Sequence, residues 1–141
     1  MMFKFLPLFA LLLLLINSRS ENKATKMGID FFKGTFSEAL AASKETGKPI
    51  FIDFYTTWCG PCKQLKKVSF KDKAVGEYYN KNFICISVDA EKGEGIEVAR
   101  QYNVRSYPTL LIINNNGAVK ARTEGFMKPY ILINFGRRVV P

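Results

Sequence analysis

Hydrophobic positions along this chain fall into short continuous runs that alternate with stretches of helical spacing. The runs rich in aliphatic and aromatic residues predict strands, because β-branched and aromatic side chains pack well on a sheet. The strands predicted in this way cover residues 29–32, 49–55, 83–89, 109–113 and 118–123. The second run is apolar throughout except at Asp53, as expected of a central strand that is covered on both faces.

Between these runs, apolar residues recur every three or four positions, which is typical of helices that pack on a sheet. The predicted helices cover residues 36–46, 60–68, 74–80, 94–103 and 128–138. Thr35 and Glu38 form a capping-box pattern at the start of the first helix, and Gly47 ends it. The order of elements predicts an α/β fold with helices on both faces of one sheet.

The first twenty residues are typical of an export signal. Lys4 precedes an apolar run, and small residues fit cleavage after Ser20. The run is shorter than the roughly 20 residues that span a membrane, although retention as an anchor is the alternative. We expect residues 1–20 to be a signal peptide, 21–28 a polar leader and 29–141 one domain. That domain would act outside the cytosol, in the periplasm if the source is a Gram-negative bacterium.

Composition narrows the possible functions. The 141 residues are 48% hydrophobic, enough for one domain with a real core. The formal charge is +9, but the basic residues do not interleave with aromatic ones in any nucleic-acid motif. We therefore assign the lysines to solvated helix faces and expect no nucleic-acid partner. Histidine is absent, which excludes Cys–His and Ser–His catalysis and every His-ligated metal site.

Two cysteines three positions apart, Cys59 and Cys62, lie where a predicted strand gives way to a helix. Cys59 falls at the helix N-terminus, where unpaired amides and the helix dipole favour an anion such as a thiolate. Cys62 lies one turn inside. The arrangement indicates a redox site in which the thiols carry the electrons, so no cofactor is expected. Half of a zinc site is the alternative, but the only other thiol, Cys85, is in a strand, and we predict no metal.

The residues around this pair resemble the thioredoxin family. The resemblance covers approximately residues 30–138 and rests on three segments in the family's order and spacing: Ile52-Asp53-Phe54-Tyr55, Trp58-Cys59-Gly60-Pro61-Cys62-Lys63 and Tyr107-Pro108-Thr109. Residues 68–72 also resemble the extracytoplasmic thioredoxin-like proteins, including the C-terminal domain of the membrane reductase DsbD. The resemblance implies the thioredoxin fold, with a central mixed sheet flanked by helices.

The resemblance also implies roles for the residues of the CxxC segment. Cys59 is the attacking thiol and Cys62 the resolving one, and together they form a redox-active disulfide. Trp58, Gly60 and Pro61 make up the active-site turn. Trp58 would shield the disulfide and offer a flat docking surface, although a plain core aromatic is an equal alternative. Pro61 adds no amide proton and no cation to stabilise the thiolate, so we expect a reducing potential.

Further site residues are implied outside that segment. Asp53 matches the family's buried carboxylate, which assists proton transfer at the resolving cysteine, and desolvation should raise its pKa. Cys85 stands where many thioredoxins carry a lysine, which leaves Asp53 without that cation. Pro108 matches the family's cis-proline, and the backbone of Tyr107 would pair with substrate. Gly125 matches a glycine of the same groove. An ordinary strand start and an ordinary turn are the alternatives for Pro108 and Gly125.

We therefore expect an exported thiol–disulfide oxidoreductase that reduces disulfides in protein substrates. An oxidising compartment would exhaust it, so we also expect a membrane electron donor of the DsbD kind. A monomer is the favoured oligomeric state. Two alternatives stay open from the sequence: an oxidase or isomerase on the same fold, and a non-catalytic docking module.

Overall fold

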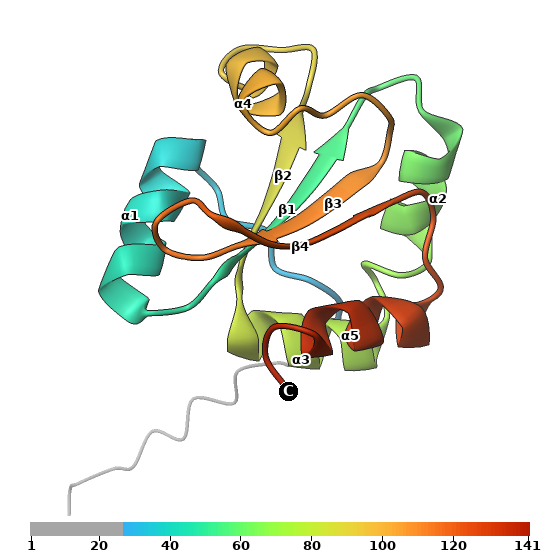
Figure 1. Ribbon diagram of the computed structural model, residues 1–141. Coiled ribbons are helices and arrows are strands. Elements are labelled where there is room, and N and C mark those ends of the chain that lie inside the picture. The colour runs from blue at the N-terminus through green and yellow to red at the C-terminus, as the bar shows by residue number, and fades with distance from the viewer. Residues whose placement is uncertain (1–26) are drawn as a thin grey trace, which may run out of the picture.

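The computed structural model describes residues 27–141, and its centre is a four-stranded mixed sheet (Figure 1). The strands are β1 (Ile50–Tyr55), β2 (Ile84–Asp89), β3 (Thr109–Ile113) and β4 (Val119–Glu124). Their order across the sheet is β2-β1-β3-β4. β1 runs parallel to β2 and antiparallel to β3, and β4 is antiparallel to β3. The predicted mixed sheet is confirmed.

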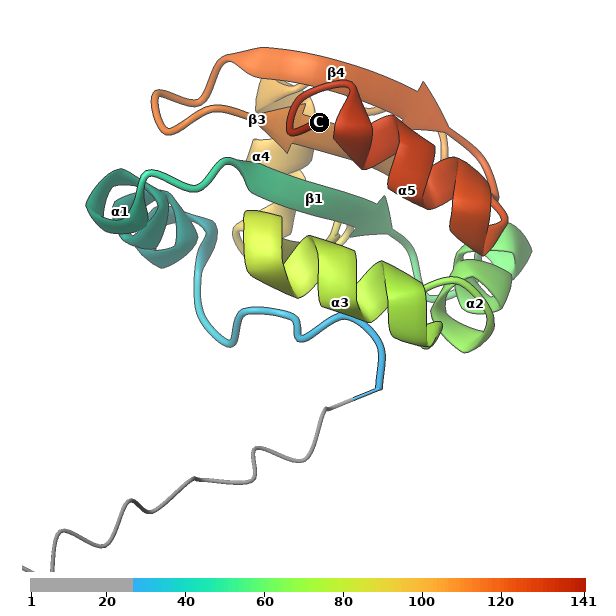
Figure 2. The same ribbon diagram turned by 90° about the horizontal axis from the view of Figure 1, so that it is seen from below.

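Helices cover both faces of this sheet. Within the described residues they are α1 (Phe36–Thr46), α2 (Gly60–Lys67), α3 (Lys73–Asn82), α4 (Gly95–Gln101) and α5 (Pro129–Arg137). α1 and α4 pack on one face, while α3 and α5 lie side by side on the other (Figures 1 and 2). The predicted capping box of α1 is present, since Thr35 and Glu38 bond each other's backbone amides.

Alternation along β1 divides its side chains between two cores. Ile52 and Phe54 pack in the core beneath α1 and α4. Phe51 packs in the opposite core with residues of α2, α3 and α5. Asp53 is two positions from Phe51, so its side chain is on the same face as Phe51. The strand period therefore places the one carboxyl group of β1 on the side of the sheet that α2 covers.

The predicted strand at residues 29–32 is wrong. The segment is irregular, and its backbone bonds go to different elements. The Ile29 amide donates to the Phe70 carbonyl at 2.7 Å, and the Phe32 amide donates to the Cys85 carbonyl at 2.7 Å. Phe70 lies in the turn after α2, whereas Cys85 lies in β2. A ladder requires successive partners on one strand, so the apolar run packs without joining the sheet.

The described chain begins against α3. Asn80 donates its side-chain amide to the Gly28 carbonyl at 3.0 Å. A Cβ on Gly76 would lie 2.4 Å from the Gly28 carbonyl oxygen, so only glycine allows this close approach. The predicted signal peptide (1–20) and most of the predicted leader lie outside the described residues. Among residues 27–141, no helix has both the length and the apolar character needed to cross a membrane.

Candidate active site

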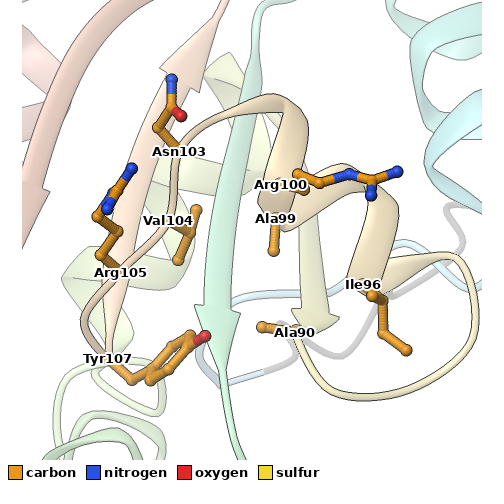
Figure 3. Close-up of a pocket in the computed structure, with 8 residues that line it drawn as sticks. All are labelled: Ala90, Ile96, Ala99, Arg100, Asn103, Val104, Arg105 and Tyr107. Carbon is orange, nitrogen blue, oxygen red and sulfur yellow. The ribbon is translucent and has the colours of Figure 1, made fainter.

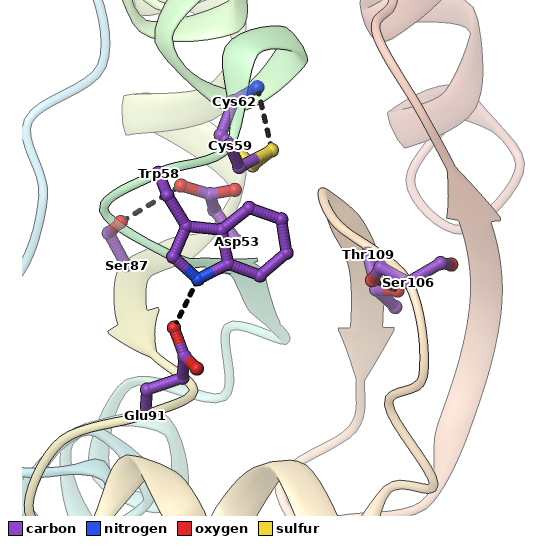
Figure 4. The surroundings of a disulfide bond; sticks show 8 residues. All are labelled: Asp53, Trp58, Cys59, Cys62, Ser87, Glu91, Ser106 and Thr109. Carbon is purple, nitrogen blue, oxygen red and sulfur yellow. Dashed lines mark hydrogen bonds between the residues drawn. A yellow bond between two sulfur atoms is a disulfide. The ribbon is translucent and has the colours of Figure 1, made fainter.

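The dithiol lies at the start of α2, just after β1 ends. Cys59 is the N-cap residue, and its sulfur accepts a hydrogen bond from the Cys62 amide at 3.2 Å. A disulfide joins the two residues, whose Cα atoms are 5.3 Å apart (Figure 4). Pro61 stands in the first turn, where its missing N–H removes no helical hydrogen bond. The local sequence therefore places one sulfur at the positive end of the helix dipole.

Burial does not distinguish the two cysteines. Cys59 is 3% exposed and Cys62 is 2% exposed, so the attacking thiol is not simply the more accessible one in the disulfide form. Their positions on the helix do differ. The Cys59 sulfur accepts a hydrogen bond from a helix amide, whereas Cys62 lies within the helix. Apart from the chain neighbours and the backbone of its own helix, nothing lies within 4 Å of the place that a Cβ on Gly60 would occupy, so the space beside the turn is open.

The Trp58 side chain is exposed beside the disulfide (Figure 4). It is 65% exposed, which excludes the alternative of a core aromatic. Its indole N–H donates to the Glu91 carboxylate at 2.6 Å, and its ring meets the Tyr107 ring edge-on at a centroid distance of 6.0 Å. Two separate loops thus hold the indole in place. Glu91 could not be predicted from the sequence, because the local pattern of a loop does not indicate which distant residue its side chain will contact.

The Tyr107–Pro108 segment lies close to Trp58. The peptide bond between these two residues is cis. The Pro108 carbonyl accepts a hydrogen bond from the Gly125 amide at 2.9 Å. Gly125 has φ +88°, a conformation that favours glycine, and the space beside its Cα is open. The structure therefore brings together the three residues implied by the resemblance, with Tyr107 and Gly125 partly exposed and Pro108 buried.

Asp53 is buried beneath the dithiol helix. It is 1% exposed, and its Oδ2 accepts a hydrogen bond from the Ser87 hydroxyl at 2.9 Å (Figure 4). Its Oδ1 has no hydrogen-bond partner among the described residues. Burial raises the pKa of Asp53 to about 6, while the Ser87 bond and the charge of Lys66 act in the opposite direction. This carboxyl group can exchange protons near neutral pH.

Cys85 occupies the position of the family's usual lysine, but the charge of another lysine, Lys66, does act on Asp53. Lys66 is in α2, and its charge offsets part of the rise in the pKa of Asp53 that burial causes. The ammonium lies 3.3 Å from the centroid of the Tyr55 ring, so this side chain is not simply a solvated lysine on a helix face.

Cys85 is separate from the redox pair. It is buried in the core that contains Phe51, and burial raises the pKa of its thiol. Its sulfur lies 3.9 Å from the Tyr79 carbonyl oxygen. In residues 27–141, no group of three or more His, Cys, Asp or Glu side chains could hold a metal ion. Cys85 therefore packs as a small apolar residue.

A shallow cavity of about 280 Å³ borders Tyr107 (Figure 3). It lies between α4 and the loop that leads to the cis peptide. Its lining residues are Ala90, Ile96, Ala99, Arg100, Asn103, Val104, Arg105 and Tyr107. Sequence reasoning found only Tyr107 of this set, since the cavity depends on how the loop returns over α4.

A CxxC disulfide at a helix start, close to a buried carboxyl group of the central strand, is the arrangement of a thiol–disulfide exchange protein. The family model of the thioredoxin-like domain matches residues 36–139. A thioredoxin-like protein of Synechocystis is 35% identical over 98 residues, which are 70% of this chain and 85% of that protein. The solution structure of a proposed disulphide isomerase from Bacteroides thetaiotaomicron is 45% identical with a TM-score of 0.68, covering 79% of this chain and 92% of that one.

The chain belongs to the thioredoxin-like family, and it is a dithiol–disulfide oxidoreductase. It is also similar to part of a larger protein. The thiol:disulfide interchange protein DsbD of Vibrio vulnificus is 33% identical over 117 residues, which are 77% of this chain but only 19% of DsbD. The similarity therefore concerns one segment of DsbD and leaves most of that protein unmatched.

Proposed function

We propose that this protein acts outside the cytosol and reduces disulfide bonds in other proteins. The observation that carries the proposal is the Cys59 sulfur at the start of α2, with Cys62 within bonding distance and a buried carboxyl group on the same side of the sheet. The likeness to DsbD, whose name describes thiol–disulfide interchange, supports the same chemistry.

In the first step, the Cys59 thiolate attacks one sulfur of a client disulfide. A mixed disulfide forms, and the other client sulfur leaves as a thiolate. The helix N-terminus stabilises the attacking anion. Trp58 and Tyr107 give the client an exposed aromatic surface, while the backbone of Tyr107 and the open side of Gly125 receive an extended client segment.

In the second step, Cys62 gives its proton to the Asp53 carboxylate and attacks the Cys59 sulfur. The bond from Cys59 to the client breaks, and the second client sulfur leaves as a thiolate. Two electrons pass from the dithiol to the client, and the protein ends as the Cys59–Cys62 disulfide. A pKa of about 6 suits Asp53 to this transfer near neutral pH.

A dithiol donor must then reduce the Cys59–Cys62 disulfide, and we propose a membrane donor of the DsbD kind. The variant Cys62→Ser cannot resolve a mixed disulfide, so its Cys59 thiolate should accumulate linked clients in cells, and linked donors that present their own disulfide. The matched control is Cys59→Ser with Cys62 intact, which should capture none. Recovery of no Cys59-linked protein would count against both donor and client.

The reduction potential of the Cys59–Cys62 pair tests the direction of electron flow. The reducing members of this fold have potentials near −270 mV, whereas strong oxidants lie near −120 mV. We expect a value close to the reducing end, together with insulin reduction by the wild type and none by Cys59→Ser. A potential above about −180 mV would overturn the reductase proposal.

Disulfide isomerisation is a second candidate, favoured by the likeness to the proposed disulphide isomerase of Bacteroides thetaiotaomicron. An isomerase attacks a client and is then displaced by a client thiol, so it does not need its own resolving cysteine. Refolding of a scrambled disulfide protein by Cys62→Ala separates the two candidates. An isomerase keeps activity in this variant, whereas a reductase loses it.

A further inference from the structure

We propose that Ser87 is a positioning residue for the resolving step, and that it holds the Asp53 carboxylate with one oxygen anchored and the other directed to the dithiol. The inference rests on the role given above to Asp53. Sequence reasoning did not mark Ser87, which has no motif of its own. It becomes visible only when β1 and β2 are paired.

The register of the sheet brings the two side chains together. Asp53 and Ser87 are directly paired in the parallel strands β1 and β2. The Ser87 hydroxyl donates to Asp53 Oδ2 at 2.9 Å, while Oδ1 has no partner in the described part of the chain. The terminal torsion of an aspartate is broad, so an isolated carboxylate would rotate. A single anchored oxygen limits that rotation and leaves the other oxygen bare.

Among the side chains around Asp53, Ser87 makes the hydrogen bond to its carboxylate. On β3, the residue opposite Asp53 is Leu110, which is fully buried and apolar. The titratable groups on this face are Tyr55 on β1, Cys85 and Asp89 on β2, Cys59 at the N-cap of α2, and Cys62 and Lys66 within α2. Lys66 acts through its charge, and its ammonium lies over the Tyr55 ring. The hydroxyl of Ser87 is the group that donates a hydrogen bond to the carboxylate.

Removal of this hydroxyl has two consequences. A hydrogen bond to the charged carboxylate favours that form, so its loss raises the proton affinity of Asp53 further. The freed carboxylate also loses the restraint that keeps Oδ1 available to Cys62. The pH at which Asp53 becomes a competent proton acceptor therefore moves upward, and resolution slows below that pH.

The first test is a carboxyl titration of the full chain by carbon-13 NMR. It uses the disulfide form, in which Cys59 and Cys62 do not titrate, and Asp53→Asn identifies the signal. We expect Ser87→Ala to raise the pKa of Asp53 by about one unit, as for a lost hydrogen bond to a charged group. Ser87→Thr keeps a hydroxyl and should stay near the wild type. An unchanged pKa in Ser87→Ala overturns the proposal.

A buried serine far from the dithiol provides the control for structural effects. Ser43 is fully buried in α1 and bonds the Lys48 carbonyl. We expect Ser43→Ala to reduce stability without moving the pKa of Asp53. If Ser43→Ala moved it as much as Ser87→Ala does, the direct contact would not be the cause, and the proposal would fail.

The second test measures the rate at which Cys62 resolves a mixed disulfide, as a function of pH. In Ser87→Ala, the rise of the rate with pH should occur about one pH unit higher than in the wild type. Ser87→Ala should have no further effect when Asp53→Asn is present. A slower rate with an unchanged dependence on pH would indicate a merely structural role and overturn the inference. If Asp53→Asn itself keeps the wild-type dependence of the rate on pH, the role proposed for Asp53 fails. The carboxyl titration still tests the contact between Ser87 and Asp53 separately.

Discussion

This small domain contains two kinds of buried sulfur, in Cys59 and in Cys85. Cys59 and Cys85 are 3% and 2% exposed, so solvent access in the disulfide form does not separate them. Their surroundings do. Cys59 caps a helix and accepts an amide hydrogen bond, whereas Cys85 is in a strand among apolar side chains, where burial raises the pKa of its thiol.

This difference shows what the fold adds to a thiol. A cysteine in an apolar core is held as the neutral thiol, because desolvation disfavours the anion. At a helix start, partial positive charge from free amides offsets that cost. The protein therefore confines thiol chemistry to one end of α2 without exposing it, and Cys85 contributes only packing.

The largest expected effect is on turnover. Cys59→Ser should reduce insulin reduction by about a thousandfold or more, since a hydroxyl cannot form the mixed disulfide. Cys85→Ala should keep activity within about twofold, because its sulfur takes no part in exchange. A substantial loss in Cys85→Ala, with the fold intact by circular dichroism, would break the contrast between the two sulfur sites.

Alkylation sharpens the same contrast in the reduced protein. At neutral pH we expect iodoacetamide to modify Cys59 about a hundred times faster than Cys85, because the thiolate is the reactive species. Mass spectrometry of timed samples follows both sites. Modification of Cys85 should become rapid only in denaturant. Equal rates in native buffer would show that the helix terminus confers no reactivity.

Asp53 predicts a smaller effect, on stability. Its pKa is about 6 in the native state against 3.8 for the ordinary group, so the native state binds more protons between these values. The free energy of unfolding of the disulfide form therefore falls as pH rises from about 4 to 6, and the loss is complete above that range. Asp53→Asn removes this dependence and should be more stable at pH 8 by about 2 to 3 kcal/mol.

Urea denaturation at pH 4 and pH 8 measures this effect. The difference between wild type and Asp53→Asn should appear at the higher pH and shrink at the lower one. A variant that is less stable than wild type at pH 8 would contradict the raised pKa, and with it the electrostatic contrast between the dithiol face and the rest of the core.

The smallest expected effect is the packing contribution of Cys85. Cys85→Ala removes one buried sulfur atom and should reduce the free energy of unfolding by about 1 kcal/mol. The loss should not depend on pH between 5 and 8, since the thiol stays neutral there. A loss that grew with pH would indicate a titrating Cys85 and would weaken the assignment of this residue to packing alone.

The sequence allowed the sheet, the helices and the dithiol to be predicted, because each depends on local pattern. The period of β1 and the helix formers after Cys62 are visible in a few residues. The run at 29–32 was misassigned because the same apolar pattern suits a packed irregular segment. Whether such a run becomes a strand depends on a partner edge, which local pattern does not reveal.

The parts of the site that escaped prediction depend on pairing between distant segments. Ser87 meets Asp53 through the parallel register of two strands that are far apart in sequence. Glu91 reaches Trp58 from a loop after β2, and Lys66 turns toward Tyr55 from the helix surface. Each is an ordinary residue in its own segment, so its role appears only in three dimensions.

The attachment of the chain's beginning to α3 has a consequence for how this domain meets other molecules. Gly28 accepts a hydrogen bond from Asn80 of α3, and Ile29 donates to the Phe70 carbonyl, which follows the C-terminal end of α2, whereas Cys59 caps its N-terminal end. The described chain therefore begins near the end of α2 that is away from Cys59. If the domain were attached to another structure through Met27, the helix end that carries the Cys59–Cys62 disulfide would face away from the attachment and could contact large folded proteins.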